Sequence, residues 1–484
     1  MADSISDLER LRDMIDYAWE EAINLGLDPF PTHFELVPAT IMYEFASYGL
    51  PGRFSHWTHG KAYYRQKMHY DLGLSKIYEM VVNTNPSYAF LMEMNDLLQN
   101  TFVAAHVFGH TDFFKNNAYF QHTSRRMIDK VSIHAERIAK YEFDHGKAEV
   151  EHFLDAILSI QEHVDYNLFL QSDESANEEE QEKHKLTAPS SEYDDLWGLD
   201  KKARRAEEDR DLRPGKPPKF PEKPEKDILQ FLVRHAPHLQ PWQRDIIEIV
   251  RLEQLYFVPQ MQTKVMNEGW ASLAHSRIMR RMAERGLISD SDVLEFAQLH
   301  SGVLSPSSTS LNPYYLGYKM YEDIERRWDN PTKEEQERLG RKQNMGKQKI
   351  FEVREMENDV SFLRNYLTKD LIKDLDLYVF RKEGDEWVIV EKDWEKVRDN
   401  IVASMTNFGF PYLVIDDGDY HGNRELYIKH MFEGQELDLV YAEKTLQHVY
   451  MVWNRPVHLE TVYDGKRILL SYDGERNSKT SLEK

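Results

Sequence analysis

The sequence predicts an α+β protein: a large, mainly helical N-terminal domain that contains a short sheet, followed by a small C-terminal α+β domain. Apolar residues recur at helical spacing over most of residues 1–369. After about residue 377 the pattern changes to short strand-like segments with interleaved helices. A tract rich in charge and proline interrupts the helical part, and a length of 484 residues suits two or three domains.

In the N-terminal part, the apolar spacing predicts a series of helices and two intervening strands. The second helix is expected to end at Gly49, and Asn95 is the expected N-cap of the third. The fourth stretch is long enough for one or two helices. The predicted helices cover 4–26, 34–48, 96–116, 128–170 and 227–286, and the predicted strands cover 77–83 and 87–94.

Composition sets the expected domain boundaries. Residues 172–227 hold 17 acidic residues, 12 basic residues and six prolines, which is typical of a solvated, mobile insertion. We therefore expect residues 1–171 and 228–369 to form the helical domain and residues 370–484 the small α+β domain. In and near that domain the predicted strands are 376–381, 387–391, 411–416, 424–432, 456–462 and 466–472, and the predicted helices are 393–406 and 438–452.

Composition also excludes several classes of protein. The net charge of −22 disfavours binding to nucleic acid and to anionic membranes, because both are negatively charged. The absence of cysteine excludes disulfides, thiolate metal ligands and a cysteine nucleophile. Neither a signal peptide nor a transmembrane run is visible, so we expect a cytoplasmic protein without stable membrane insertion. Histidine is abundant: 11 of the 20 lie in residues 1–171.

Two of these histidines are the strongest candidates for chemistry. His106 and His110 are four residues apart, so they share one face of a helix and could bind one metal ion. Glu268 lies far downstream, in a segment Asn-Glu-Gly-Trp-Ala on another predicted helix. Together these segments resemble the gluzincin zinc hydrolases, which bind zinc through two histidines on one helix and a glutamate on a later helix. The resemblance implies a zincin-like core in which these three residues bind a divalent metal, zinc first and iron as the alternative.

The pattern departs from those enzymes at one position. In their HExxH motif, the glutamate after the first histidine is the general base for metal-bound water. Here that position is Val107, which cannot accept a proton. Asp112 is a candidate replacement, although on an ideal helix it lies about 200° away from His110. His56 is a further catalytic candidate.

Other polar residues are expected near these ligands. Tyr314 is a candidate for stabilising an oxyanion. His134 is expected close by. His275 lies seven residues after Glu268, so it falls on the same helical face and could support the ligands.

A second pattern competes with this one. Glu142 and His145, and likewise Glu149 and His152, match the Glu-x-x-His motif of di-iron helical bundles. In those bundles the motifs lie on facing helices, whereas here they are seven residues apart on one probable helix. The alternative to both metal sites is a helical core whose histidines are satisfied by hydrogen bonds, with Glu268 capping or pairing.

Several longer segments resemble the SpoVR (stage V sporulation protein R) family. They include IYEMVVNTNPSYAFLMEMN at 77–95, AHVFGHTDFFKNN at 105–117, YFVPQMQTKVMNEGWAS at 256–272, LNPYYLGY at 311–318 and RELYIKHMFEGQELDLVYAEKTL at 424–446. The resemblance implies a role in forming the spore cortex, a peptidoglycan layer, or in stationary-phase and stress physiology. It also implies two possible partners, a PrkA-type serine kinase and a von Willebrand-A-like protein. Whether a reaction is catalysed stays open, and so does the alternative of a non-catalytic assembly protein.

Overall fold

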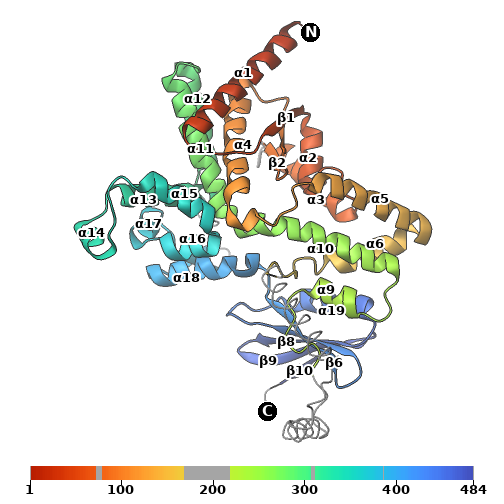
Figure 1. The fold of residues 1–484 in the computed structure, drawn as a ribbon. Helices are drawn as coiled ribbons and strands as arrows, with labels where there is room; N and C mark the ends of the chain where they lie inside the picture. The colour runs from red at the N-terminus through yellow and green to blue at the C-terminus, as the bar shows by residue number, and fades with distance from the viewer. Residues whose placement is uncertain (1, 72–78, 168–218, 307–310, 385, 483–484) are drawn as a thin grey trace, which may run out of the picture. The chain divides into compact units, whose positions relative to one another are not determined.

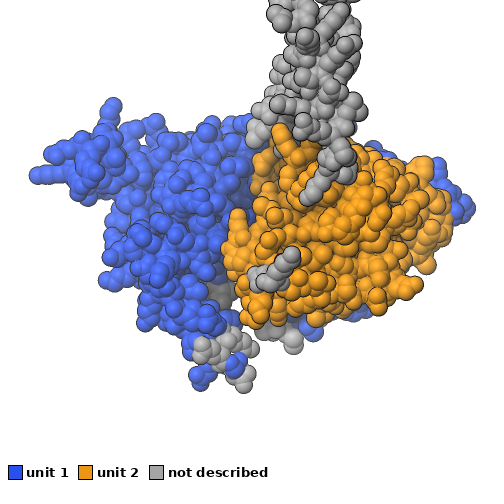
Figure 2. Space-filling view, turned by 90° about the horizontal axis from the view of Figure 1, so that it is seen from below, with its two compact units in different colours: residues 1–144, 256–409 blue, residues 145–255, 410–484 orange. Residues whose placement is uncertain are grey.

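The computed structural model describes the chain except for residues 1, 72–78, 168–218, 307–310, 385 and 483–484 (Figure 1). The chain divides into two compact units, coloured separately in Figure 2. The first comprises residues 1–144 and 256–409, and the second comprises residues 145–255 and 410–484. Most of the predicted insertion at 172–227 lies outside the described residues.

The first unit is mainly helical, as predicted, and contains a short sheet. Its helices are α1 Ala2–Asn24, α2 Ala39–Tyr48, α3 Trp57–Asp71, α4 Leu97–Asn116, α5 Met127–His145, α11 Lys264–Glu284, α12 Asp290–Val303, α13 Pro313–Asp329, α14 Lys333–Leu339, α15 Gly346–Met356, α16 Asp359–Tyr366, α17 Lys369–Asp374 and α18 Trp394–Met405. Its strands are β1 Thr32–Val37, β2 Glu79–Val82, β3 Ser87–Met92, β4 Val379–Glu383 and β5 Glu386–Glu391.

Strands β1, β3 and β2 form a three-stranded sheet in that order, with β1 parallel and β2 antiparallel to β3. Alternate residues of β3 face opposite sides, as the pleat requires. Ala89 and Leu91 join the core that includes α4, while Phe90 and Met92 join a second core with Met42 of α2. The sheet therefore lies between α4 and α2, and its α4 side carries the functional candidates.

Three local predictions are wrong. Residues 34–48 are not one helix, because Thr32–Val37 pairs as β1 and the helix starts only after Pro38; proline disfavours helical backbone in the residue before it. The N-cap of α4 is Asp96, whose carboxylate accepts the Gln99 N–H at 2.7 Å, and not Asn95.

The third wrong prediction is that one helix carries both Glu-x-x-His motifs, whereas the expectation of one or two helices over residues 128–170 is met by two. These residues do not contain one continuous helix through both motifs. Gly146 has φ +96° and separates α5 from α6 Lys147–Leu158. This backbone conformation favours glycine and ends a helix.

The second unit combines helices with a five-stranded sheet. Its helices are α6, α9 Ile228–His235, α10 Pro241–Gln262 (whose last residues belong to the first unit) and α19 Leu439–Trp453. Its strands are β6 Leu413–Tyr420, β7 Glu425–His430, β8 Val457–Tyr463, β9 Lys466–Tyr472 and β10 Asn477–Ser481, in the order β10-β9-β8-β7-β6. The sequence did not predict the edge strand β10, which is polar throughout. A small C-terminal sheet domain is thus present, as predicted.

The boundary between the units differs from the expected residue 370. Val397 and Val402 of α18 are fully buried in the same core as α4 and α11, so residues up to 409 pack with the first unit. Residues 145–167, expected in the helical domain, pack instead with the C-terminal sheet domain, for example through α6 against α19.

Across the described residues, no helix is both long and apolar enough to cross a membrane.

Candidate metal centre

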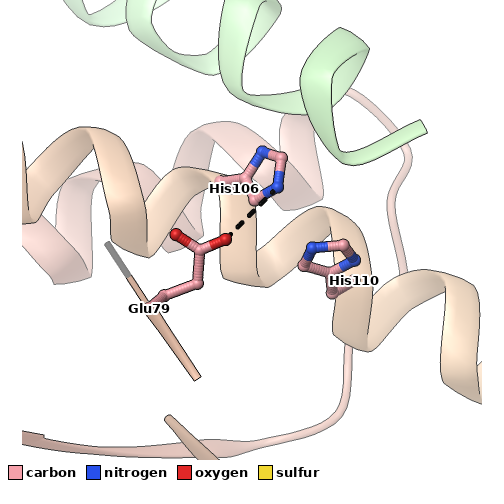
Figure 3. A group of neighbouring side chains, drawn as sticks. All are labelled: Glu79, His106 and His110. Carbon is pink, nitrogen blue, oxygen red and sulfur yellow. Dashed lines mark ion pairs between the residues drawn. The ribbon is translucent and has the colours of Figure 1, made fainter. Parts of the chain in front are cut away.

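Four side chains of the first unit lie close together, and ligand atoms of three of them, Glu79, His106 and His110, lie within 4.8 Å of one another. His106 Nε2 lies 3.7 Å from Glu268 Oε2 and 3.6 Å from Glu79 Oε1, and His110 Nε2 lies 3.4 Å from Glu268 Oε2. Figure 3 shows three of them, with Glu79 and the two histidines drawn as sticks. We call Glu79, His106, His110 and Glu268 the His–Glu cluster. Its members come from β2, α4 and α11, far apart in the sequence.

Strand register places Glu79 in this cluster. Glu79 pairs with Leu91 across the antiparallel β2–β3 ladder, and directly opposed residues project from the same face of a sheet. Leu91 packs in the core that includes α4, so the Glu79 carboxylate points toward α4 and reaches His106. The sequence analysis missed this residue. The sequence signal for Glu79 was that it is the single carboxylate of an otherwise apolar predicted strand, which precedes the helix that carries His106 and His110.

Small residues allow α4 and α11 to approach closely enough for the cluster to form. Gly109, between the two histidines, packs on Ala271 of α11: a Cβ at 109 would lie 2.6 Å from the Ala271 Cα. On the other side of α11, Gly269 packs against Gly317 of α13 so tightly that a Cβ on Gly269 would overlap the Gly317 backbone. These glycines flank the ligands on both helices, so backbone packing fixes their separation.

The nitrogens that point away from the cluster are hydrogen-bonded. His110 Nδ1 lies 2.9 Å from Asn267 Oδ1, which can only accept, so Nδ1 carries a proton and Nε2 is the nitrogen that faces the cluster. His106 Nδ1 lies 2.8 Å from Nδ1 of His275, which is the supporting position expected for His275. Such contacts on the far ring nitrogen orient metal-binding histidines.

Two atoms of the cluster are buried without a hydrogen-bond partner among the described residues: His106 Nε2 and Glu268 Oε2. Buried polar atoms in native proteins are nearly always paired, and an unpaired one costs about 1–3 kcal/mol. A metal ion would satisfy both. Tetrahedral bonds of about 2.0–2.1 Å place ligand atoms roughly 3.3 Å apart, close to the 3.4–3.7 Å found here. The residues therefore fit a divalent ion.

Burial and charge act on the cluster in opposite directions. Burial, and then the neighbouring carboxylate of Glu268, raises the pKa of Glu79 to about 8. Burial lowers the pKa of His106 to about 4. Burial also opposes ionisation of Glu268, but the imidazoles of His110 and His106 outweigh it and hold the Glu268 pKa below its usual value. A neutral His106 imidazole beside an ionised Glu268 carboxylate matches the protonation states that a metal ion requires of its ligands.

Tyr314, the predicted oxyanion group, lies beside the cluster. It lies in the first turn of α13, where the Asn312 side chain accepts its backbone N–H at 2.9 Å. Its ring stacks on His106 with centroids 6.0 Å apart. Burial, followed by the charges of Glu268 and Glu79, raises the Tyr314 pKa, so the hydroxyl stays protonated and can donate a hydrogen bond.

Asp112 is held on another face of α4. Its carboxylate accepts the Trp270 indole N–H and the backbone N–H of Asp28, each at 2.7 Å, and lies 3.6 Å from Arg354 Nε. Through these contacts the Asp112 carboxylate joins α4 to α11, to α15 and to the segment that follows α1. The structure therefore gives Asp112 a packing role and does not bring it to the His–Glu cluster.

The remaining candidates lie elsewhere. His56 precedes α3, where its Nδ1 lies 2.7 Å from Thr58 Oγ1. His134 is buried within α5. His145 ends α5 and stacks on Trp242 at 4.9 Å, with Glu142 one turn before it. The second Glu-x-x-His motif is exposed on α6, so the structure does not assemble a di-iron arrangement from these two motifs.

Comparisons with known proteins find family matches along most of the chain. The family described as "SpoVR like protein" matches residues 5–410, and the family described as "SpoVR-like C-terminal domain" matches residues 411–464. The junction of the two matches coincides with the unit boundary at residues 409 and 410. A protein of Escherichia coli (strain K12) described as "Uncharacterized protein YcgB" is 28% identical over 458 residues, which cover 90% of this chain and 88% of that protein. No solved structure matches significantly.

Proposed function

This chain belongs to the SpoVR family, and from the geometry of the His–Glu cluster we propose that it is a metal-binding protein with a zincin-like centre. His106, His110 and Glu268 would hold a divalent ion, zinc first and iron as the alternative. The observation that carries the proposal is the convergence of two imidazole Nε2 atoms on one carboxylate, with His110 Nδ1 turned outward onto an acceptor. A helical core stabilised only by hydrogen bonds would not leave His106 Nε2 and Glu268 Oε2, which lie 3.7 Å apart, buried without a hydrogen bond.

The chemistry proposed for this centre is hydrolysis of a peptide or cell-wall precursor, in keeping with the family's link to the spore cortex or to stationary-phase and stress physiology. A bound divalent ion lowers the pKa of water and polarises a carbonyl. Val107 is fully buried in the apolar core and takes no part. Glu79 is the carboxylate that β2 brings to the cluster beside His106, so we assign it either the fourth ligand position or the base role that Val107 cannot fill. Tyr314 would donate its hydroxyl to the substrate carbonyl.

Metal analysis tests the proposal directly. Protein purified without chelator should carry about one equivalent of zinc or iron, measured by inductively coupled plasma mass spectrometry. The double variant His106→Ala, His110→Ala should lose it. A matched control, His152→Ala with His238→Ala, removes two exposed histidines of the second unit and should keep it. Equal metal content in both double variants would refute the site.

A second candidate function is a non-catalytic assembly protein, for which the proposed partners are a PrkA-type serine kinase and a von Willebrand-A-like protein. The observation that favours it is a pair of adjacent apolar side chains at the start of α19 in the C-terminal domain, where Val440 is 62% and Tyr441 71% exposed. On this view Glu268→Gln would lower stability but spare partner binding. If Glu268→Gln folds normally, binds partners and still loses the cellular phenotype, the cluster is chemical and the assembly function fails.

A further inference from the structure

Three imidazoles form a row that starts at the His–Glu cluster. His106 Nδ1 lies 2.8 Å from His275 Nδ1, and His275 Nε2 lies 2.7 Å from His300 Nδ1. His275 is completely buried in α11, while His300 on α12 is half-buried. Both ring nitrogens of His275 are therefore used, one toward the cluster and one away from it.

Each of these two contacts requires one proton. Two facing N–H groups would collide, and two facing lone pairs would not bond, so one nitrogen of each pair must donate. A neutral imidazole holds one proton on one of its two nitrogens, so a neutral His275 donates in one of these two contacts and accepts in the other. With one proton on the central ring, the row has only two consistent arrangements.

In the first arrangement, His106 donates from Nδ1 to His275, and His275 donates from Nε2 to His300. In the second, His300 donates from Nδ1 to His275, and His275 donates from Nδ1 to His106. The proton of neutral His106 then sits on Nε2, inside the cluster. A metal ion at the cluster needs the lone pair of His106 Nε2, so only the first arrangement is compatible with metal.

We propose that His275 and His300 are positioning residues that fix the proton on His106 Nδ1 and thereby present the Nε2 lone pair of His106 to the metal ion. The inference rests on the proposed metal centre and extends it to two residues that touch neither the metal nor a substrate. Metal binding and the direction of the histidine row are linked: the ion selects the first arrangement, and a row held in that arrangement favours the ion.

The outer end of the row lies among charged groups. The His300 ring is 5.4 Å from that of Tyr318, and the charges of Glu322, Arg280 and Lys319 act on it. These four residues also line a cavity of about 780 Å³ between α11 and α13. His300 therefore has polar surroundings that can accept the proton on its Nε2 in the first arrangement, while the inner end of the row is closed to solvent.

Two substitutions at His275 separate the hydrogen bond from packing. The Oδ1 of asparagine occupies nearly the position of Nδ1 in histidine, so His275→Asn keeps an acceptor for His106 but cannot reach His300. His275→Ala removes both contacts. Zinc affinity of wild type, His275→Ala, His275→Asn and His300→Ala would be measured by competition with a chromophoric chelator. Circular dichroism and urea unfolding of the same preparations would confirm that each variant folds.

We expect His275→Ala to lower zinc affinity roughly 10–100-fold, as is common when a group that orients a metal-binding histidine is lost, and His275→Asn to restore most of it. In zinc-loaded wild type labelled with 15N-histidine, the nitrogen shifts should show His275 protonated at Nε2 alone. In His300→Ala this preference should weaken. Comparison of each histidine variant with wild type assigns the resonances of the substituted histidine, because they are missing from the spectrum of the variant.

The outcomes separate the two proposals. Wild type that binds no zinc or iron overturns the metal centre and this inference with it. Wild type that binds zinc while folded His275→Asn and His275→Ala bind it equally well or equally poorly overturns the inference alone. If His275→Ala does not fold, the wild-type spectrum decides, since a proton on His275 Nδ1 in the zinc-loaded protein contradicts the proposed direction.

Discussion

Adding one methyl group at Gly109 should disturb the metal centre without touching a ligand. A Cβ there would lie 2.6 Å from the Ala271 Cα and 3.0 Å from the Ala274 Cβ, whereas ordinary contact starts at 3.4 Å. To relieve this overlap, α4 and α11 must move apart by about 0.8 Å, because backbone atoms of a helix cannot rotate away as a side chain can. The same movement would stretch the His110–Glu268 separation from 3.4 Å to about 4.2 Å, which is too long for two ligands of one zinc ion.

The expected change in stability of Gly109→Ala is the sum of two opposing contributions. Overpacking costs about 1–3 kcal/mol, while replacing glycine by alanine inside a helix gains about 1 kcal/mol. Gly60→Ala supplies the matched control, because Gly60 lies in α3 with no atom within 4 Å of the added Cβ. Gly60→Ala should stabilise the protein, and Gly109→Ala should be less stable than Gly60→Ala by about 1–3 kcal/mol.

Urea unfolding of the metal-free protein measures the stability, and chelator competition measures zinc affinity. We expect Gly109→Ala to bind zinc at least about tenfold more weakly, equivalent to about 1.4 kcal/mol, and Gly60→Ala to bind it like wild type. If the two variants match in both stability and affinity, the close approach of α4 and α11 does not position the ligands, and the reasoning fails.

Three further predictions concern groups around the centre. Asp112→Ala leaves the Trp270 indole N–H without its acceptor and Arg354 without its carboxylate, so urea unfolding should show a loss of about 2–5 kcal/mol; a loss below 1 kcal/mol would contradict this. Because burial raises the Glu79 pKa from 4.5 to about 8, the folded metal-free protein holds a proton that the unfolded chain releases, and the Glu79 contribution is present below pH 4.5 and lost as pH rises toward 8. Wild type should therefore lose stability relative to Glu79→Gln between pH 5 and 8.5 in unfolding titrations. If the two plots of stability against pH stay parallel, the raised pKa of Glu79 is refuted. Asp359 accepts the backbone N–H groups of Val265 and Met266 at 2.9 Å each, so Asp359→Ala should cost about 1–2 kcal/mol in thermal unfolding, as for a lost helix cap; an unchanged melting temperature would show that the cap is dispensable.

Local sequence signals predicted much of the fold. The four-residue spacing of His106 and His110 and the apolar period around it defined α4 correctly. The short, mostly apolar runs at 77–83 and 87–94, separated by the turn residues Asn85 and Pro86, predicted β2 and β3. These signals are strong because each depends on neighbours within one turn or one strand.

What the sequence could not supply is contact between distant segments. The place of Glu79 depends on strand register with Leu91, and the row from His106 through His275 to His300 depends on how α4, α11 and α12 pack. Asp112 illustrates the reverse case: its position beside His110 suggested catalysis, but the packing of Trp270 and Arg354 against it decides its role. Short-range spacing does not carry that information.

The glycine contact that sets the distance between α4 and α11 would also limit which ions the proposed centre could accept. Two helices held at a fixed distance exclude ions whose radius does not suit the space between their ligands. Calcium requires six to eight oxygen ligands at 2.3–2.6 Å, whereas the His–Glu cluster offers two imidazoles and the carboxylates of Glu79 and Glu268, and the close contact at Gly109 holds α4 and α11 together. Magnesium keeps most of its water shell and avoids nitrogen. Any selectivity of the proposed centre for zinc or iron over alkaline-earth ions would thus come from a backbone contact made by a residue that has no side chain.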